Sequence, residues 1–135
     1  MTAGYSDTPL SKKLGVKPDQ RVVVLDEPAG FRRLLTGTGG AISLADHVEG
    51  SADVVVWFLT RLSDLESRIE SVEAAVFPAG MIWFAWPKRA SSVETDLSRD
   101  AIRAFVLERR LVDVKICAID ETWSGLKVVW RREHR

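Results

Sequence analysis

Cysteine and histidine are scarce in this sequence, which has one cysteine and two histidines among 135 residues. The single cysteine, Cys117, excludes an internal disulfide and a Cys-x-x-Cys pair for zinc or redox chemistry. Two histidines are too few for a typical zinc site, so we expect no bound metal. The sequence has no Gly-x-Ser-x-Gly motif for a serine nucleophile, and Cys117 falls in a buried-strand pattern that makes a thiol less reactive. We therefore predict no catalytic residue.

An excess of charge and a long apolar segment are also absent. Lys and Arg number 19, as do Asp and Glu, so the chain lacks the broad basic face that nucleic-acid binding needs. The longest apolar runs, residues 54–59 and 81–86, are much shorter than a membrane-spanning helix. The first residues lack the cationic and apolar pattern of a signal peptide. We expect a cytoplasmic protein with no membrane partner and without nucleic acid.

Apolar segments alternate with helical patterns along the chain. Because most of the apolar segments are apolar throughout, they favour a mainly parallel sheet covered by helices on both faces. The last two strands are close enough to form an antiparallel hairpin, with Gly125 as the break between them. We predict one α/β domain over residues 1–135, with residues 1–20 as a helical or extended lead-in. The predicted strands are 21–25, 41–45, 53–59, 81–86, 112–119 and 126–131, and the predicted helices are 31–35, 60–76 and 96–110.

Helix starts are predicted from local capping residues. Ser63 and Glu66 have the spacing of a capping box near the start of the helix over residues 60–76. Asp96 is a favourable N-cap for the helix that follows it. The glycine-rich segment 37–40 follows one helix and precedes a strand, so we interpret it as a plain turn rather than a phosphate loop.

The sequence resembles two known families, each through particular segments. The segment LGVKPDQRVVVLD and the closing strand–helix–hairpin order resemble a class I S-adenosylmethionine (SAM)-dependent methyltransferase, with one strand and two helices of that family missing. More closely, YSxTPLxKKLG, AWPK, TDL and DETWSGLK together are similar to a small family of bacterial proteins with no established activity. The first resemblance implies a three-layer, Rossmann-like, methyltransferase-like sheet of about six strands.

The loop after the first strand departs from the methyltransferase pattern. That family has a glycine-rich turn here, because only glycine lets backbone amides and the cofactor approach so closely. This sequence has Asp26, Glu27, Pro28, Ala29 and Gly30 instead. Proline has no amide hydrogen, and two acids would repel a phosphate or the cofactor's own carboxylate. We therefore expect no cofactor.

Polar and aromatic residues gather where the predicted parallel strands end, which is where ligands bind in open α/β sheets. Two indoles would form the apolar walls of a small pocket there, and Lys88 would meet an acidic group of the ligand. Thr60, Arg61 and Arg89 belong to the same edge, although each of these residues also fits an ordinary structural role. The candidate ligand-binding residues are Asp26, Glu27, Asp46, Trp86, Lys88, Asp120, Glu121 and Trp123.

We predict a non-catalytic binding or regulatory module whose partner is an unknown small molecule or protein. The alternative is a minimal SAM-dependent methyltransferase, with Asp46 on the ribose and Trp86 or Trp123 against the adenine or the substrate. A further alternative, a nucleic-acid accessory protein, depends on the basic end of the chain, residues 131–135. Indoles at strand ends also suit contacts between subunits, so the sequence allows a homodimer.

Overall fold

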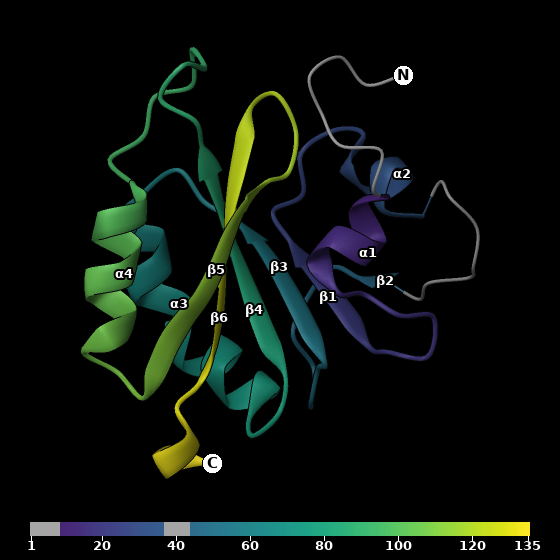
Figure 1. Cartoon of the computed structure of the whole chain (residues 1–135), viewed down its shortest axis with the longest axis vertical. Helices are drawn as coiled ribbons and strands as arrows, with labels where there is room; N and C mark the ends of the chain where they lie inside the picture. Colours follow the sequence, from purple (N-terminus) through teal and green to yellow (C-terminus); the bar gives the residue numbers. More distant parts are fainter. Residues whose placement is uncertain (1–8, 37–43) are drawn as a thin grey trace.

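A computed structural model of the chain describes residues 9–36 and 44–135 (Figure 1). The proposed turn at 37–40, most of the strand predicted over 41–45, and Tyr5 to Thr8 of the first family motif lie outside these ranges. The helices are α1 (Leu10–Leu14), α2 (Phe31–Thr36), α3 (Leu62–Val76), α4 (Arg99–Leu107) and a final 3-10 turn (Arg132–His134). The strands are β1 (Val22–Leu25), β2 (Leu44–Ala45), β3 (Val54–Phe58), β4 (Met81–Pro87), β5 (Leu111–Ala118) and β6 (Trp123–Trp130).

The strands form one six-stranded sheet in the order β2-β1-β3-β4-β6-β5. The strands β2, β1, β3 and β4 are parallel, and β6 runs antiparallel to both of its neighbours, β4 and β5. In Figure 1 the β5–β6 hairpin therefore places its second strand inside the sheet and its first strand at the edge. The predicted mainly parallel α/β sheet with a closing antiparallel hairpin is confirmed.

The short link between β2 and β3 crosses to the other side of β1 without a helix. It can do so because the described residues of β2, Leu44 and Ala45, pair with Val22 and Val23 at the start of β1. The chain therefore has little distance to travel back before β3 begins. The end of the link is held by two backbone bonds, from the Ala52 N–H to the Ala75 carbonyl (2.8 Å) and from the Asp53 N–H to the Arg21 carbonyl (2.9 Å).

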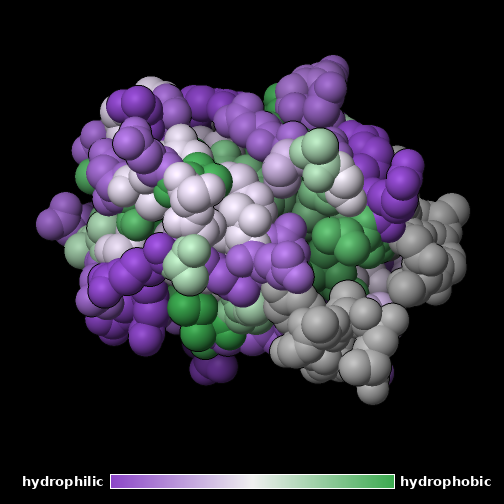
Figure 2. Space-filling view, turned by 90° about the horizontal axis from the view of Figure 1, so that it is seen from above, coloured by the Kyte–Doolittle hydropathy of each residue, from purple (hydrophilic) through white to green (hydrophobic). Residues whose placement is uncertain are grey.

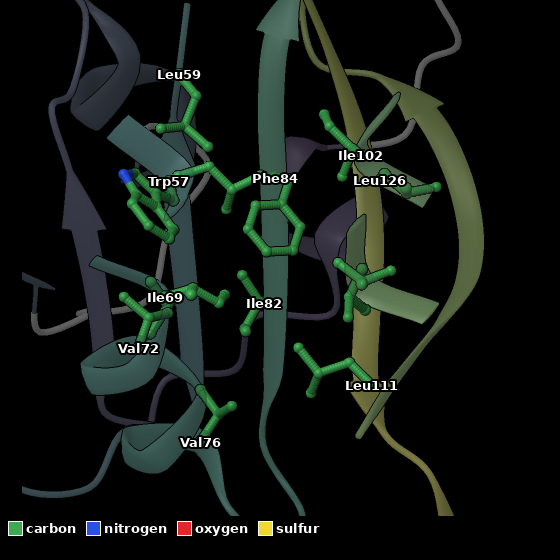
Figure 3. Close-up of a cluster of buried hydrophobic side chains, with 14 of the residues drawn as sticks. Trp57, Leu59, Ile69, Val72, Val76, Ile82, Phe84, Ile102, Leu111 and Leu126 are labelled. Carbon is green, nitrogen blue, oxygen red and sulfur yellow. The ribbon is translucent and has the colours of Figure 1, made fainter. Parts of the chain in front are cut away.

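The helices cover both faces of the sheet. On one face, α3 and α4 pack against the even-numbered side chains of β4 and β6, and Figure 3 shows Ile69, Val72 and Val76 of α3 near Ile82 and Trp57. On the other face, α1 and α2 pack on β1 and β3, with Phe31 against Phe58 at 4.7 Å between ring centroids. Burying each such large apolar side chain contributes about 1.5–3 kcal/mol, so the two clusters supply the main driving force for this fold.

Both predicted local caps are wrong. The helix α3 begins at Leu62, so Ser63 lies inside its first turn, and the Leu62 N–H donates instead to Asp96 Oδ1 at 2.8 Å. The helix α4 begins three residues later than predicted and is capped by Ser98, whose Oγ accepts from the Ala101 N–H at 3.1 Å. Local spacing could not reveal this, because Asp96 caps a helix that starts 34 residues earlier in the chain.

Gly125 is also not the break between the last two strands. It lies within β6 and pairs with Ala85 on one side and Cys117 on the other. A Cβ at this position would stand 3.1 Å from Ile119 Cδ1 and 3.2 Å from Trp83 Cε3. The glycine is therefore explained by the close approach of two side chains rather than by a turn.

Candidate functional site

A pocket of about 880 Å³ opens at the carboxyl ends of β3 and β4. The residues after β3, the end of β4, the loop that follows it and the start of α4 form its walls. Figure 2 views the molecule from above Figure 1, toward this edge, and shows hydrophilic residues interspersed with smaller hydrophobic areas. The lining residues are Thr60, Arg61, Trp86, Pro87, Lys88, Arg89, Val93, Glu94, Thr95, Asp96, Leu97, Ser98 and Arg99.

The pocket lining is positively charged although the whole chain is neutral. Four of the lining residues are cationic and two are acidic, which leaves two positive charges in excess. The cationic residues come from three separate segments: the start of α3, the exit of β4 and the first turn of α4. The parallel sheet therefore gathers at one place charges that are dispersed in the sequence. The four cations are Arg61, Lys88, Arg89 and Arg99.

The loop between β4 and α4 is held against the end of β3 by hydrogen bonds. Thr95 Oγ1 donates to the Thr60 carbonyl at 2.7 Å and accepts from the Leu97 N–H at 3.0 Å. The Asp96 N–H also donates to the Thr60 carbonyl, at 3.3 Å. On the other side, the Lys88 N–H donates to the Thr122 carbonyl at 2.7 Å, which joins the loop to the hairpin turn. These bonds preorganise the pocket walls.

The floor of the pocket is apolar. Trp86 is only 6% exposed and packs in the core cluster beneath α3 and α4, together with Leu97. Val93, on the rim, is exposed. The pocket therefore combines a small apolar floor with a mostly polar and charged lining, which favours a charged ligand over an apolar one.

The two predicted indole walls lie on opposite faces of the sheet. In the β4–β6 ladder Trp86 pairs with Ser124, whereas Trp123 pairs with Pro87. Since adjacent residues of a strand point to opposite faces, Trp86 lines the pocket and Trp123 packs on the α1–α2 side, 5.0 Å from Phe58 between ring centroids. The structure therefore does not bring the two indoles together.

The polar groups of the β1–α2 loop are bonded to one another and to α3. Asp26 has φ 55° and forms an ion pair with Arg68 of α3 at 2.9 Å. The Glu27 carboxylate pairs with the Arg32 guanidinium at 3.0 Å and accepts from the Arg32 N–H at 3.2 Å. The Phe31 N–H donates to the Pro28 carbonyl at 3.2 Å. The first amides of α2, which could otherwise face an anionic ligand, are thus bonded within the loop.

Asp46 lies after β2 and is bonded to its sequence neighbour. Its Oδ1 lies 2.9 Å from His47 Nδ1, and His47 Nε2 lies 3.2 Å from Glu49 Oε2. The hydrogen bond to His47 lowers the pKa of Asp46, and the hydrogen bonds to Asp46 and then Glu49 raise the pKa of His47. All three side chains are largely exposed, and none of them belongs to the pocket lining.

Asp120 and Glu121 belong to the hairpin turn between β5 and β6. Asp120 Oδ1 accepts from the N–H groups of Thr122 and Trp123, both at 2.8 Å, which is an ordinary turn-forming arrangement. Glu121 is exposed. Of the eight predicted site residues, the pocket lining therefore includes only Trp86 and Lys88.

Sequence reasoning missed Arg99 and the segment 93–98 as parts of the site. The expected helix start at Asp96 placed Arg99 inside a helix rather than at its first residue. The polar stretch 91–98 between a parallel strand and a helix was the available signal, because such loops border the ligand crevice of open sheets.

Within residues 9–36 and 44–135, no group of three His, Cys, Asp or Glu side chains is placed to hold a metal ion. The helices of these ranges are all too short or too polar to cross a membrane. Cys117 is half-buried, and burial raises the pKa of its thiol, which disfavours the reactive thiolate.

Comparisons with known proteins add to this geometry. A scan against protein-family models finds no match, and a search of curated proteins finds none. Solved structures do match. The ribosomal protein L11 methylase from Lactobacillus delbrueckii subsp. bulgaricus is similar with a TM-score of 0.60 and 14% identity, over 91% of this chain and 76% of that chain.

Two further similar structures are complexes with S-adenosylhomocysteine (SAH). The magnesium protoporphyrin IX methyltransferase from Synechocystis PCC 6803 with bound SAH has a TM-score of 0.60 and 9% identity, over 90% of this chain and 78% of that chain. The DhpI–SAH complex has a TM-score of 0.58 and 13% identity, over 82% of this chain and 76% of that one. At such low identity the likeness concerns the fold alone. The chain thus has a Rossmann-like α/β fold of the kind found in SAM-dependent methyltransferases.

Proposed function

We propose that this chain is a non-catalytic binding or regulatory module on a methyltransferase-like fold, with its ligand site in the pocket beside β3 and β4. The observation that carries the proposal is the β1–α2 loop, in which Asp26 and Glu27 form ion pairs with Arg68 and Arg32. The pocket supplies a separate place for a ligand, so the protein can bind that ligand without using the β1–α2 loop.

The residues of the β1–α2 loop do not fit SAM. A cofactor in this position needs backbone N–H donors and close approach, which a glycine-rich turn provides. Here Pro28 has no N–H, and the N–H groups of Phe31 and Arg32 are bonded to the Pro28 carbonyl and the Glu27 carboxylate.

The pocket lining supports binding better than catalysis. Its described residues include no histidine or cysteine. Of its two acids, Asp96 is bonded to the Leu62 N–H, and Glu94 is exposed on the loop rather than buried in the pocket. A general base must be free to take a proton from its substrate, and a nucleophile needs such a base beside it. We therefore assign no catalytic residue to this pocket.

The alternative function is a minimal SAM-dependent methyltransferase, which is favoured by the likeness of the fold to methyltransferases, one of them with bound SAH. Titration calorimetry of the full chain with SAM and with SAH separates the two proposals. We expect no saturable heat from either compound. Saturable binding at micromolar concentration that Asp46→Asn weakens would contradict the proposal and support the alternative, in which Asp46 holds the ribose.

The partner is proposed to be a small molecule or a protein rather than nucleic acid, since the two charge types balance over the chain. Clean flow-through on heparin is the expected result, and salt-dependent retention would favour the nucleic-acid accessory reading. The cytoplasmic location and the homodimer stay predictions.

A further inference from the structure

We infer that the pocket binds a small organic phosphate monoester, with the phosphate held by Arg61, Arg89 and Arg99. The inference rests on the proposed function in one respect, because it uses the same pocket as the ligand site. It adds the chemical class of the ligand and the residues that select it.

No ion pair with an acid involves Arg61, Arg89 or Arg99 within the described residues, although all three line the pocket. Ion pairs within 4.0 Å join four other arginines to acids: Arg32 to Glu27, Arg68 to Asp26, Arg103 to Asp113 and Arg109 to Glu73. Other described arginines, such as Arg33, also form no such pair, so what sets these three apart is that they line one pocket and can act on one ligand.

Two of these arginines occupy positions where a positive charge is unfavourable. Arg61 is the N-cap residue of α3, and Arg99 is the first residue of α4. The N-terminus of a helix is the positive end of its dipole, and N-caps are normally Ser, Thr, Asp or Asn. A bound anion would offset the repulsion at both helices, so the placement is explained by a ligand rather than by the stability of the free protein.

The charge and size of the pocket suit a phosphate monoester. A phosphate monoester carries about −1.5 to −2 charges at pH 7, opposite in sign to the three arginines of the lining. Its three terminal oxygens can accept from several guanidinium groups at once, whereas each carboxylate offers two. The pocket volume, about 880 Å³, leaves room for an organic body over the apolar surface of Trp86, Leu97 and Val93.

The test is titration calorimetry of the full chain with phenyl phosphate, inorganic phosphate, succinate and phenol as probes. We expect saturable binding of phenyl phosphate, weaker binding of inorganic phosphate, and no saturable heat with phenol. The variant Arg99→Gln should weaken the binding of phenyl phosphate about tenfold. The double variant, Arg89→Gln with Arg99→Gln, should weaken this binding further. Arg33→Gln, an exposed arginine on α2 away from the pocket, is the matched control and should leave the affinity unchanged.

Three results would overturn the inference: no saturable binding of phenyl phosphate, equal affinity in the double variant and the parent chain, or tighter binding of succinate. Circular dichroism of each variant establishes that it is folded. The outcome is independent of the SAM titration. Binding of SAM would count against the proposed function alone, and failure of phenyl phosphate would count against this inference alone.

Discussion

The carboxylate of Asp96 accepts a hydrogen bond from the Leu62 N–H at 2.8 Å, so a residue of the β4–α4 loop caps the distant helix α3. This bond explains how α3 starts after an arginine, a residue that cannot cap a helix through a side-chain acceptor. It also fixes one wall of the pocket to the start of the helix.

Removing this cap should destabilise the protein. Asp96→Ala leaves the Leu62 N–H without its partner, and loss of a capping side chain typically costs about 0.5–2 kcal/mol. Urea unfolding followed by far-UV circular dichroism measures the change. Glu94→Ala, an exposed position of the same loop, is the control and should have little effect. Equal stability of Asp96→Ala and the parent chain would contradict a capping role.

Replacing Arg61, at the start of α3, should stabilise the free protein. Arg61→Ser puts a preferred N-cap residue before α3 and removes a positive charge from the positive end of the helix dipole. Removing this charge should raise the free energy of unfolding by no more than about 0.3–1 kcal/mol, because solvent screens the charge of an exposed residue. Tm should therefore rise. Differential scanning calorimetry measures the change, with Arg33→Gln as control. A fall in Tm would show that Arg61 has a structural role that we have not identified.

Adding one methyl group at Gly125 should disturb the core beneath the hairpin. The new Cβ of Gly125→Ala would lie 3.1 Å from Ile119 Cδ1 and 3.2 Å from Trp83 Cε3, and overpacking of this kind costs about 1–3 kcal/mol. Thermal unfolding should show the loss. Ser124→Ala, the adjacent residue of the same strand, is the control. An unchanged Tm for Gly125→Ala would mean that Ile119 can move aside freely.

The Asp46–His47–Glu49 cluster should give a small dependence of stability on pH. Because the pKa of His47 is raised on folding, its contribution is fully present below the unfolded pKa, about 6.5, and is lost as pH rises through the folded pKa. The pKa of Asp46 is lowered, so its contribution is present above the unfolded pKa and is lost as pH falls through the folded value. Their joint contribution is therefore greatest in mildly acidic solution.

NMR titration of the His47 ring tests this directly. Asp46→Asn should lower the pKa of His47 more than Glu49→Gln does, since the hydrogen bond to Asp46 is the largest cause of the shift. An unchanged His47 pKa in Asp46→Asn would show that the pair does not form in solution.

The sequence by itself determined the kinds of secondary structure and the class of fold. Val22 to Leu25 and residues 54–58 are apolar throughout, and Leu65, Ile69, Val72 and Val76 recur at helical spacing, so each segment specifies its own structure. The unusual β1–α2 loop could also be recognised from Asp26, Glu27 and Pro28 alone, because it follows a predicted strand directly.

Only the tertiary structure decided which residues share the pocket. The register of β4 with β6 sends Trp86 and Trp123 to opposite faces, and a one-residue difference in pairing would have reversed that result. Asp96 reaches the start of α3, and Arg99 shares a pocket with Arg61, only because the β4–α4 loop folds back over the end of β3. Periodicity reports neighbours a few residues apart, whereas a site at the end of a parallel sheet is built from segments that become neighbours only when the strands pair.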